Sequence, residues 1–377
     1  MRNVYNLSIR AWLLSLLCLL VGGRAVANEP QHSEPTDDYI TVNDVTLVPG
    51  STDTYQVEIS LVGSQIYTAY QMDILFPPGV EPVLMRDVYV KPFNTDDNDL
   101  CSSSHTIGVS YGVVKERTLR MSCASLQNSP FYGKSGKLLY FKVKASPYLK
   151  PGDVVLKVTN FDLIKENAQT YHCKDQTLTL HATAESTATL SVSGSSHYGT
   201  CVLPFAVPTL PDGVKAYSAK GLDDMGQLVV LSEVTQLAAY TPYILYSASG
   251  YTGSLKGEVD ANKYGEVVID GLLRGAIAPQ KKSEGYVLQD LGEGAKFYAM
   301  DGVEFLIPEG KCWLEIPAAQ ASAPQYGIQI GTTTGITAPT TTPTAYGKIY
   351  TLDGKEVKTM QLGGIYVVNG KKVLKIK

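Results

Sequence analysis

Apolar and polar residues alternate along several short stretches of the chain. Between positions 55 and 61 every second residue is apolar, as Tyr55, Val57 and Ile59 illustrate. Successive side chains of a β-strand point to opposite faces, so this period of two predicts strands with one face in a core and the other in water. The same alternation recurs at 70–76, 119–123, 139–143, 154–158 and 178–180.

Turn-forming residues separate these stretches. Pro49-Gly50 and Pro151-Gly152 are Pro-Gly turns, and 94–98 is rich in Asn and Asp. Many short, half-buried strands without intervening helices are typical of two packed sheets. The pattern therefore predicts an all-β fold that begins with an antiparallel β-sandwich over residues 39–192.

The first 27 residues have the features of an export signal. Arg2 and Arg10 precede an apolar run over 11–21, and the small-x-small sequence Ala25-Val26-Ala27 follows. A basic start, a short apolar segment and a small-residue cleavage site predict a secretory signal peptide. A membrane anchor is the alternative, although the run is shorter than a spanning helix requires. We therefore expect a secreted or cell-surface protein.

Five segments of the predicted sandwich carry a family resemblance, namely 40–48, 55–61, 70–80, 136–143 and 149–154. Their order resembles the opening strands, the later Gly-x-Leu strand and the following turn of a cohesin-like domain. That family belongs to a superfamily that contains both cohesins and carbohydrate-binding modules. The resemblance implies a non-catalytic sandwich that engages a glycan or a protein at the cell surface, as an adhesion or binding protein.

A second module follows a Ser-Gly joint. Its opening, at Tyr198 to Phe205, and its end, at Cys312 to Pro317, resemble a small β module that is common in surface proteins of gut and oral Gram-negative bacteria. The module resembles another antiparallel unit of short strands and tight turns. The resemblance brings no catalytic residues with it.

The C-terminal end forms a third part of the chain. A Thr- and Pro-rich stretch leads to a segment in which Asp353-Gly354 and Asn369-Gly370 predict hairpin turns. This segment resembles the C-terminal sorting domain of type IX secretion substrates, which implies recognition by outer-membrane secretion machinery. A plain terminal β-meander is the alternative. The predicted parts are a signal peptide (1–27), a spacer (28–38), the cohesin-like sandwich (39–192), a linker (193–197), the second β module (198–330), a Thr/Pro-rich linker (331–345) and the sorting-domain-like β tail (346–377).

Charge and motifs exclude several classes of function. The formal net charge is −4, and removal of residues 1–27 makes the chain more acidic because they contain three arginines and no acid. Such a chain has no global attraction for nucleic acid. It contains neither a Gly-x-Gly-x-x-Gly sequence after a strand nor a Walker lysine loop, so we expect no nucleotide and no other cofactor.

Catalytic motifs are equally scarce. Gly108-Val109-Ser110-Tyr111-Gly112 fits the Gly-x-Ser-x-Gly pattern of a serine hydrolase, but a nucleophile elbow needs a helix after the serine. No such helix is predicted, so Ser110 is expected to be a strand residue. The histidines have no metal-ligand spacing, and we expect no metal site. The sequence favours a protein that is not an enzyme, with a secreted serine hydrolase at Ser110 as an alternative.

The cysteines and aromatic residues leave two questions open. Cys101 and Cys123 are the nearest pair with a plausible loop and form a candidate disulfide, whereas five reduced, buried cysteines are the alternative. Flat aromatic rings could stack on a sugar, and ordinary strand residues are again the alternative. The candidate ligand-binding residues are Tyr67, Tyr111, Phe131 and Tyr132. A polysaccharide or a surface protein is therefore the expected partner, and a structural or fimbrial component with modules as spacers is the other reading.

Overall fold

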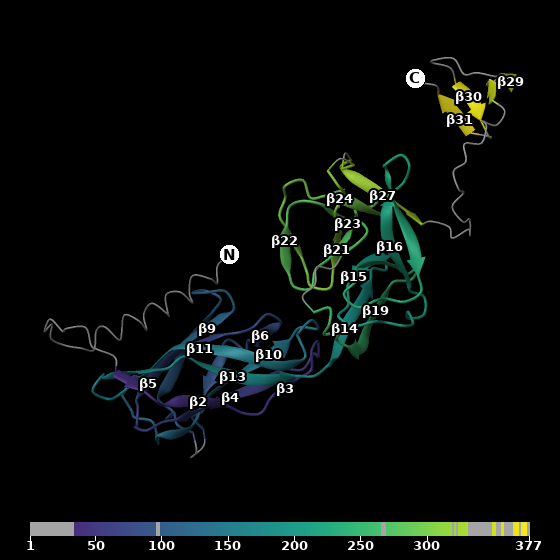
Figure 1. The fold of residues 1–377 in the computed structure, drawn as a ribbon. Helices are drawn as coiled ribbons and strands as arrows, with labels where there is room; N and C mark the ends of the chain where they lie inside the picture. Colours follow the sequence, from purple (N-terminus) through teal and green to yellow (C-terminus); the bar gives the residue numbers. More distant parts are fainter. Residues whose placement is uncertain are drawn as a thin grey trace. The chain divides into compact units, whose positions relative to one another are not determined.

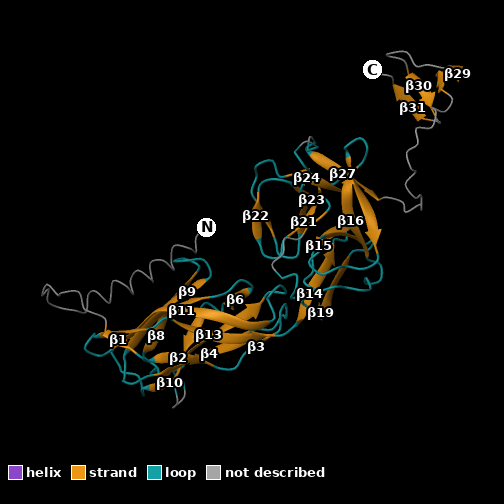
Figure 2. Ribbon diagram, in the orientation of Figure 1, coloured by secondary structure: helices purple, strands orange, loops and turns teal. Residues whose placement is uncertain are grey.

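The fold was analysed in a computed structural model of the chain, and it contains strands and no helix in the part described (Figure 2). The described residues are 34–95, 99–264, 269–318, 320–321, 323–330 and the strands between 349 and 374. The all-β prediction is confirmed. The predicted signal peptide and the Thr/Pro-rich linker lie outside the described residues. No described segment forms a helix that is long and apolar enough to cross a membrane.

The first module is a sandwich of two sheets (Figure 1). In the larger sheet the strands follow the order β1-β12-β11-β5-β9-β8, and β13 pairs with β11 and with β3. Most pairings are antiparallel, but β1 and β3 join their neighbours in parallel. The strands are β1 (Glu34–Thr36), β3 (Thr46–Leu47), β5 (Ala69–Leu75), β8 (His105–Tyr111), β9 (Thr118–Ser125), β11 (Gly152–Ile164), β12 (Thr170–Cys173) and β13 (Gln176–Ala182).

The smaller sheet covers the other side of the core. Its order is β2-β4-β10-β6, and β7 also pairs with β10. The long strand β10 pairs with β4 along eight positions, with one register shift between Lys137 and Leu139. The strands are β2 (Tyr39–Val42), β4 (Tyr55–Val62), β6 (Val80–Val83), β7 (Val90–Pro92) and β10 (Ser135–Ala145).

The core between these sheets follows the alternation of the sequence. Along β4 the apolar positions Val57, Ile59 and Leu61 are buried, and their polar neighbours are not. The ring of Phe141 on β10 meets that of Phe76 edge to face, with 5.7 Å between centroids. Removal of this apolar surface from water, at roughly 25 cal/mol per Å², is the main force that holds the two sheets together.

Strand β14 (Glu185–Val192) belongs with the second hydrophobic core, although its residues fall within the predicted sandwich range. It pairs along its whole length with β19 (Tyr251–Glu258). The core of the sandwich ends at Ala182, and Ala188, Leu190 and Val192 pack with residues of the second module. The pairing was not readable from the sequence because the paired residues are 59 or more positions apart.

The second module is built on a ten-stranded curled sheet. The order is β15-β18-β16-β17-β27-β24-β23-β26-β21-β20, and a separate pair, β22 with β25, lies beside it. The strands are β15 (Tyr198–Cys201), β16 (Lys215–Leu222), β17 (Leu228–Val234), β18 (Tyr243–Tyr246), β20 (Ile269–Asp270), β21 (Leu273–Gly275), β22 (Gln280–Lys282), β23 (Tyr286–Asp290), β24 (Ala295–Ala299), β25 (Phe305–Ile307), β26 (Cys312–Leu314) and β27 (Gln325–Ile330).

Strands β15 and β26 are far apart in this order but are in hydrogen-bond contact, so the sheet is curled. The backbone N–H of Cys312 on β26 donates to Oγ1 of Thr200 on β15 over 3.1 Å. Next to it, the N–H of Val202 donates to the carbonyl oxygen of Gly310, also over 3.1 Å. We call this contact the seam. A flat sheet would hold β15 and β26 far apart, so the seam requires the sheet to bend round on itself.

The C-terminal tail forms a separate unit that begins after residue 331. It contains four antiparallel strands in the order β29-β28-β30-β31, as the sequence predicts for a hairpin or meander. The Asp353-Gly354 and Asn369-Gly370 turns lie outside the described residues. The strands are β28 (Ile349–Thr351), β29 (Glu356–Val357), β30 (Ile365–Val368) and β31 (Lys371–Leu374).

Candidate functional site

Polar side chains gather on the outer face of the larger sandwich sheet. The register places Asp73 of β5 opposite Arg120 of β9, and Arg120 opposite Ser110 of β8. Their neighbours Met72 and Ile74 point into the core, so alternation turns these polar residues outward. We call this surface the polar face, and it comprises Gln71, Asp73, Gly108, Ser110, Arg120, Ser122, Asn160, Asp162 and His172.

An ion pair lies at the centre of the polar face. Arg120 donates from Nε to Oδ1 of Asp73 over 2.7 Å and from Nη2 to Oδ2 over 2.6 Å. Asn160 donates from Nδ2 to the same Oδ2 over 2.8 Å. The Asp73 side chain is 8% exposed and that of Arg120 is 47% exposed. A guanidinium that is anchored from below in this two-bonded way presents its remaining donors in one orientation.

The backbone helps to place Asn160. It lies in β11 where the pairing with β5 shifts register between Thr159 and Asp162, and its φ of 51° is left-handed. Asn is among the few residues other than Gly that adopt this conformation readily. A bulge of this kind re-aims a side chain, and here it directs the Asn160 amide at Asp73.

The pKa of Asp73 reflects these contacts. Burial raises the pKa, but hydrogen bonds from Arg120 and Asn160 and the charge of Arg120 outweigh it, so the pKa lies below its ordinary value. The same hydrogen bond raises the pKa of Arg120. Both groups are therefore charged at neutral pH, which favours the ion pair.

A second cluster extends the polar face across the sheet. Gln71 on β5 donates from Nε2 to Oδ2 of Asp162 on β11 over 2.7 Å. On the neighbouring β12, Nδ1 of His172 lies 2.6 Å from Oδ1 of Asp162. The small residues Ser122 and Gly108 continue the row of this cluster across β9 and β8, because Ser122 lies opposite Gln71 and Gly108 lies opposite Ser122. The face is thus polar, and the side chains of its two clusters are held by hydrogen bonds to one another.

An open strand and an apolar turn border the polar face. β8 is the last strand of the sheet order, and it has seven residues without Pro or Lys. Edge strands without such protection offer free N–H and C=O groups to another chain. Val113 and Val114, in the turn that follows β8, are exposed.

The structure separates the four predicted ligand-binding residues. Tyr67 and Phe131 are 0% and 2% exposed, and Phe131 packs against the His105 ring with 5.1 Å between centroids. Tyr111 is partly buried against Phe76, and only Tyr132 is largely exposed, at 68%. These two rings are buried in the core, so a sugar cannot stack on them. Residues 67 and 131 lie in loops outside the alternating strands, so their burial could not be read from the sequence.

The candidate disulfide pair lies side by side in the sandwich core. Cys101 and Cys123 are both buried thiols in this structure, and the Cys101 thiol donates to the carbonyl oxygen of Leu138 over 3.5 Å. The hydrogen bond with Cys123 and burial raise the pKa of Cys101, so the thiol is the stable form at neutral pH. The disulfide stays a prediction, and the neighbouring positions of the thiols permit it.

The hydrolase motif forms no nucleophile elbow. Ser110 lies inside β8 opposite Arg120, in extended backbone, as expected for a strand residue. The structure does contain a Ser–His pair that sequence reasoning missed. Oγ of Ser102 lies 2.9 Å from Nδ1 of His105, whose Nε2 lies 3.1 Å from the carbonyl oxygen of Thr68. The Ser-x-x-His spacing was its only signal.

Burial assigns the Ser102–His105 pair a structural role. Both side chains are buried, and the N–H of Ser102 also bonds Nδ1 of His105, over 2.9 Å. Burial lowers the pKa of His105, which keeps the ring neutral and able to accept these bonds. The imidazole therefore anchors the loop that precedes β8. Among the described residues, no group of three His, Cys, Asp or Glu side chains is placed to hold a metal ion.

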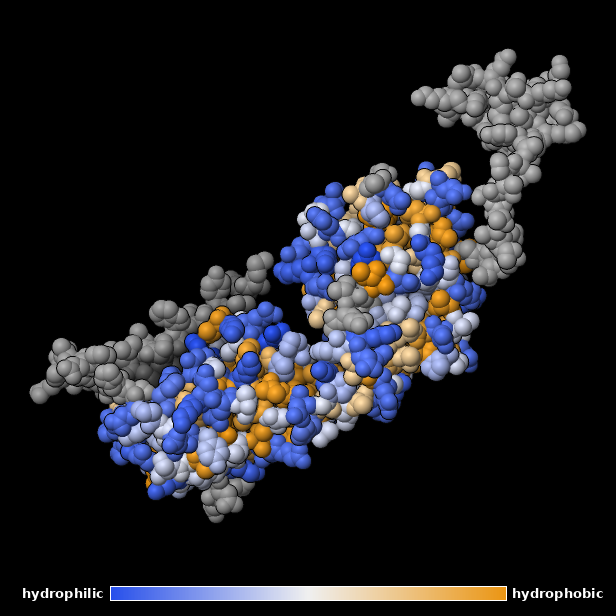
Figure 3. Space-filling model, in the orientation of Figure 1, coloured by the Kyte–Doolittle hydropathy of each residue, from blue (hydrophilic) through white to orange (hydrophobic). Residues whose placement is uncertain are grey.

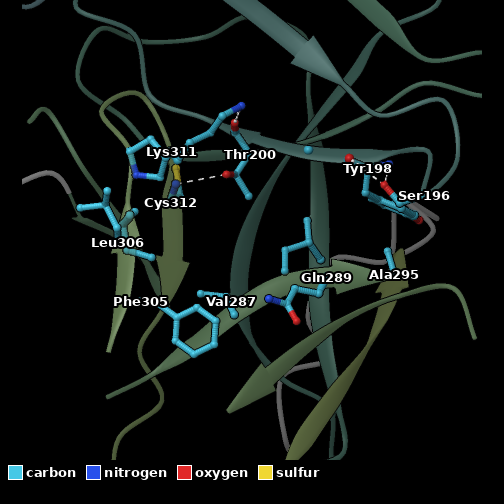
Figure 4. Close-up of a pocket in the computed structure, with 14 residues that line it drawn as sticks. Ser196, Tyr198, Thr200, Val287, Gln289, Ala295, Phe305, Leu306, Lys311 and Cys312 are labelled. Atoms are coloured by element: carbon cyan, nitrogen blue, oxygen red, sulfur yellow. Dashed lines mark hydrogen bonds between the residues drawn. The ribbon is translucent and has the colours of Figure 1, made fainter. Parts of the chain in front are cut away.

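A pocket of about 320 Å³ lies in the second module (Figure 4). Strands β15, β23 and β25 provide most of its lining, and the segment from Pro308 to Cys312 closes one side. Apolar residues such as Val287 and Phe305 share it with the polar Gln289 and Lys311. None of these residues was recognisable as part of a site from the sequence, since they come from separate strands and follow no motif.

Hydrophobic and hydrophilic side chains are interspersed over the visible face of both modules (Figure 3).

Comparisons with known proteins give a likeness in structure and none in sequence. No family model matches the chain, and no curated protein matches it. Among solved structures, a non-cellulosomal cohesin from the archaeon Archaeoglobus fulgidus has 11% identity and a TM-score of 0.29, over 39% of this chain and 91% of that one. A cohesin module from a family 33 glycoside hydrolase of Clostridium perfringens has 14% identity and a TM-score of 0.31, over 40% and 98%.

A third structure is described as a complex. It is a type I cohesin–dockerin complex from Clostridium thermocellum, with 9% identity and a TM-score of 0.30, over 42% of this chain and 99% of that one. These structure neighbours are cohesin modules, each similar to this chain over less than half of its length.

Proposed function

We propose that the chain is a non-catalytic extracellular binding protein whose first module engages a protein partner through the polar face. The observation that carries this proposal is the pair of clusters around Asp73 and Asp162, which orient Arg120, Gln71 and His172 before any partner arrives. Side chains that are already ordered lose little conformational entropy on association.

The shape of the polar face favours a protein over a glycan. It crosses five strands, which at about 4.8 Å per strand gives a width of roughly 20 Å. Gly108 and Ser122 allow the backbone of a partner to approach closely, and the open edge of β8 can pair with a strand. A sugar site depends on exposed aromatic rings, and Tyr67 and Phe131 are in the core.

The location outside the cytoplasm rests on the two ends of the sequence. Residues 1–27 have the form of a signal peptide, and 346–377 resemble a type IX sorting domain. A secreted or surface-held protein fits both, and the outer-membrane secretion machinery is then a second partner. The absence of an exposed Ser–His arrangement at Ser110 supports a binding role over hydrolysis.

Site-specific photocrosslinking in the producing cells tests the protein partner. A photoreactive amino acid replaces Ser122 on the polar face, and a matched probe replaces Lys142 on the outer side of β10 in the other sheet. We expect a discrete protein adduct from position 122 and none from position 142. Arg120→Glu should then weaken the binding of the identified partner at least tenfold, since it turns an anchored cation into a repelled anion.

Three results would contradict the proposal. Equal adducts from positions 122 and 142 would remove the polar face as the site. Saturable binding on a glycan array that is lost in Tyr132→Ala would point to a polysaccharide instead. Self-adducts at position 122, with a rising mass in sedimentation, would indicate a structural component that polymerises through β8.

A further inference from the structure

The seam of the second module shapes the pocket. Thr200 on β15 accepts the backbone N–H of Cys312 at Oγ1 and the Nζ of Lys311 at its carbonyl oxygen, over 3.1 and 3.4 Å (Figure 4). These bonds tie one end of the curled sheet to the segment after β25. The pocket beneath the seam has a volume of about 320 Å³, which lies at the low end of small-molecule sites.

One wall of the pocket is apolar. Val287 and Leu288 of β23 and Phe305, Leu306 and Ile307 of β25 line it. Leu306 remains 63% exposed, which is unusual for a large aliphatic side chain that borders a cavity. Behind this wall Phe305 packs on a small core that contains Val287, Ile307 and Trp313. A ligand against the wall would remove apolar surface from water on both sides.

The pocket contains one cation, Lys311, and one amide, Gln289, that are available to a ligand. Lys311 makes no ion pair within the described residues, whereas nearby Lys281 and Lys296 pair with Glu304 and Glu293 at 2.7 Å each. The amide of Gln289 also lines the pocket and makes no hydrogen bond to any described group. Figure 4 shows Gln289 among the lining side chains. A cation and an amide donor are therefore available beside an apolar wall.

We infer that this pocket binds a small carboxylate that carries an apolar tail. The tail lies against Phe305 and Val287, and the carboxylate takes charge-assisted hydrogen bonds from Lys311. The volume restricts the ligand to the size of a medium-chain fatty acid. The site belongs to the second module and shares no residue with the polar face, so it stands or falls independently of the proposed function.

The chemistry predicts a distinct dependence on ligand structure. Each additional CH2 that is buried contributes about 0.8 kcal/mol, or roughly a fourfold gain in affinity, until the wall is covered. Affinity should therefore rise from butyrate through hexanoate to octanoate. Octanol has the same tail without the charge and should bind about tenfold more weakly, because it forms no ion pair with Lys311.

Tryptophan fluorescence of the full chain provides the measurement. Trp12 and Trp313 are the only tryptophans, so a Trp12→Phe background leaves Trp313, which packs in the core behind the pocket wall. Titration with butyrate, hexanoate, octanoate and octanol, with calorimetry as a second readout, gives the Kd of each. We expect saturable binding with the order just described.

Variants assign the effect to Lys311. Lys311→Gln should weaken octanoate about tenfold and leave octanol unchanged. Lys256→Gln is the matched control, because Lys256 is an exposed lysine of β19 that pairs with Glu185 away from the pocket. Equal thermal unfolding of all variants ensures that folded proteins are compared. Equal affinity for octanol and octanoate, an unchanged Kd in Lys311→Gln, or no saturable binding would each overturn the inference.

Discussion

The two modules within residues 1–331 are both built from short β-strands, but they form different kinds of surface. In the sandwich, two sheets pack on one core and leave an outer polar face, where Arg120 bonds to Asp73 and Gln71 bonds to Asp162. In the second module one sheet curls until β15 meets β26, and a pocket opens beneath the seam.

The difference shows how curvature divides recognition between large and small ligands. The polar face satisfies many of its own polar groups by hydrogen bonds and suits a partner that covers a broad surface. A curled sheet encloses apolar surface and leaves Lys311 without an ion-pair partner among the described residues, which suits a small molecule. Changes in either module should therefore act on one kind of recognition and leave the other intact.

Phe141→Ala tests whether the two cores are separate. Phe141 is fully buried between the sandwich sheets, and its removal leaves a cavity that costs about 4 kcal/mol. The sandwich should unfold at a lower urea concentration, while the midpoint of the transition followed by Trp313 fluorescence should not change. Urea unfolding by circular dichroism and by fluorescence measures both. Equal shifts of the two transitions would show that the modules unfold as one.

Gly50→Ala tests the connection between the modules. Gly50 has φ +71°, and an added Cβ would lie 1.7 Å from the carbonyl oxygen of Thr187 on β14. We expect a loss of about 3 kcal/mol from the clash and the left-handed backbone. Gly152→Ala is the control, since Gly152 has φ +100° with no atom within 4 Å of the added Cβ and should lose only about 1 kcal/mol. Similar losses in urea unfolding would contradict the contact with Thr187.

Oxidation of Cys101 and Cys123 tests the rigidity beneath the polar face. Exchange with oxidised glutathione converts the two thiols to a disulfide and releases two reduced glutathione molecules. The crosslink should raise the unfolding free energy of the sandwich by about 3 kcal/mol. Non-reducing peptide mass spectrometry identifies the bond, and Cys123→Ala should abolish the gain. After the exchange, the protein is denatured without reductant and alkylated. Alkylation of both Cys101 and Cys123 would disprove the pairing.

Asp73→Ala tests the ion pair of the polar face. It leaves Arg120 and Asn160 without their acceptor, and because Arg120 is partly exposed we expect a loss of only about 2 kcal/mol. The photocrosslink from position 122 should disappear even in the folded variant, while octanoate binding is unchanged. Gln71→Ala, at the exposed end of the second cluster, should have a smaller effect on stability. A retained crosslink would show that the ion pair has no part in binding.

Acid pH should destabilise the sandwich through His105, by less than Asp73→Ala. Burial lowers the pKa of His105 below its ordinary value of about 6.5. A histidine whose pKa falls on folding favours the folded state while it is neutral, so this stability is complete above about pH 6.5 and is lost as the pH falls through the ordinary pKa. Urea unfolding between pH 7.5 and pH 5 measures the slope, which His105→Gln should reduce. An unchanged slope would contradict a buried, neutral imidazole.

In the second module, Glu309 should make the stability change with pH in the opposite direction. Burial is the largest cause that raises its pKa; Glu81 adds to it, while Ser146 and Lys144 act against it. A carboxyl whose pKa rises on folding stabilises the fold below its ordinary pKa, and this contribution disappears as the pH rises through the folded pKa. The second module should therefore tolerate mild acid better than the sandwich, which the Trp313 transition reports. Its loss of stability below pH 6 would contradict this assignment.

Much of the strand pattern was determined by the sequence itself. The alternation at 55–61 and 139–143 predicted β4 and β10 and their inward residues, since the period of two is a local property of extended backbone. Ser110 was likewise readable as a strand residue. The all-β class and the inward residues of the sandwich strands follow from this local alternation of apolar and polar residues.

Tertiary structure alone decided which residues became neighbours. Asp73 lies 47 and 87 positions from Arg120 and Asn160, and Thr200 lies 112 positions from Cys312. Alternation states which side of a strand faces the core but gives no information on which strand lies beside it. Tyr67 and Phe131 stand in loops without a period, so only packing could place them inside. Both candidate sites depend on such long-range pairings, because strand order and curvature are properties of the whole sheet.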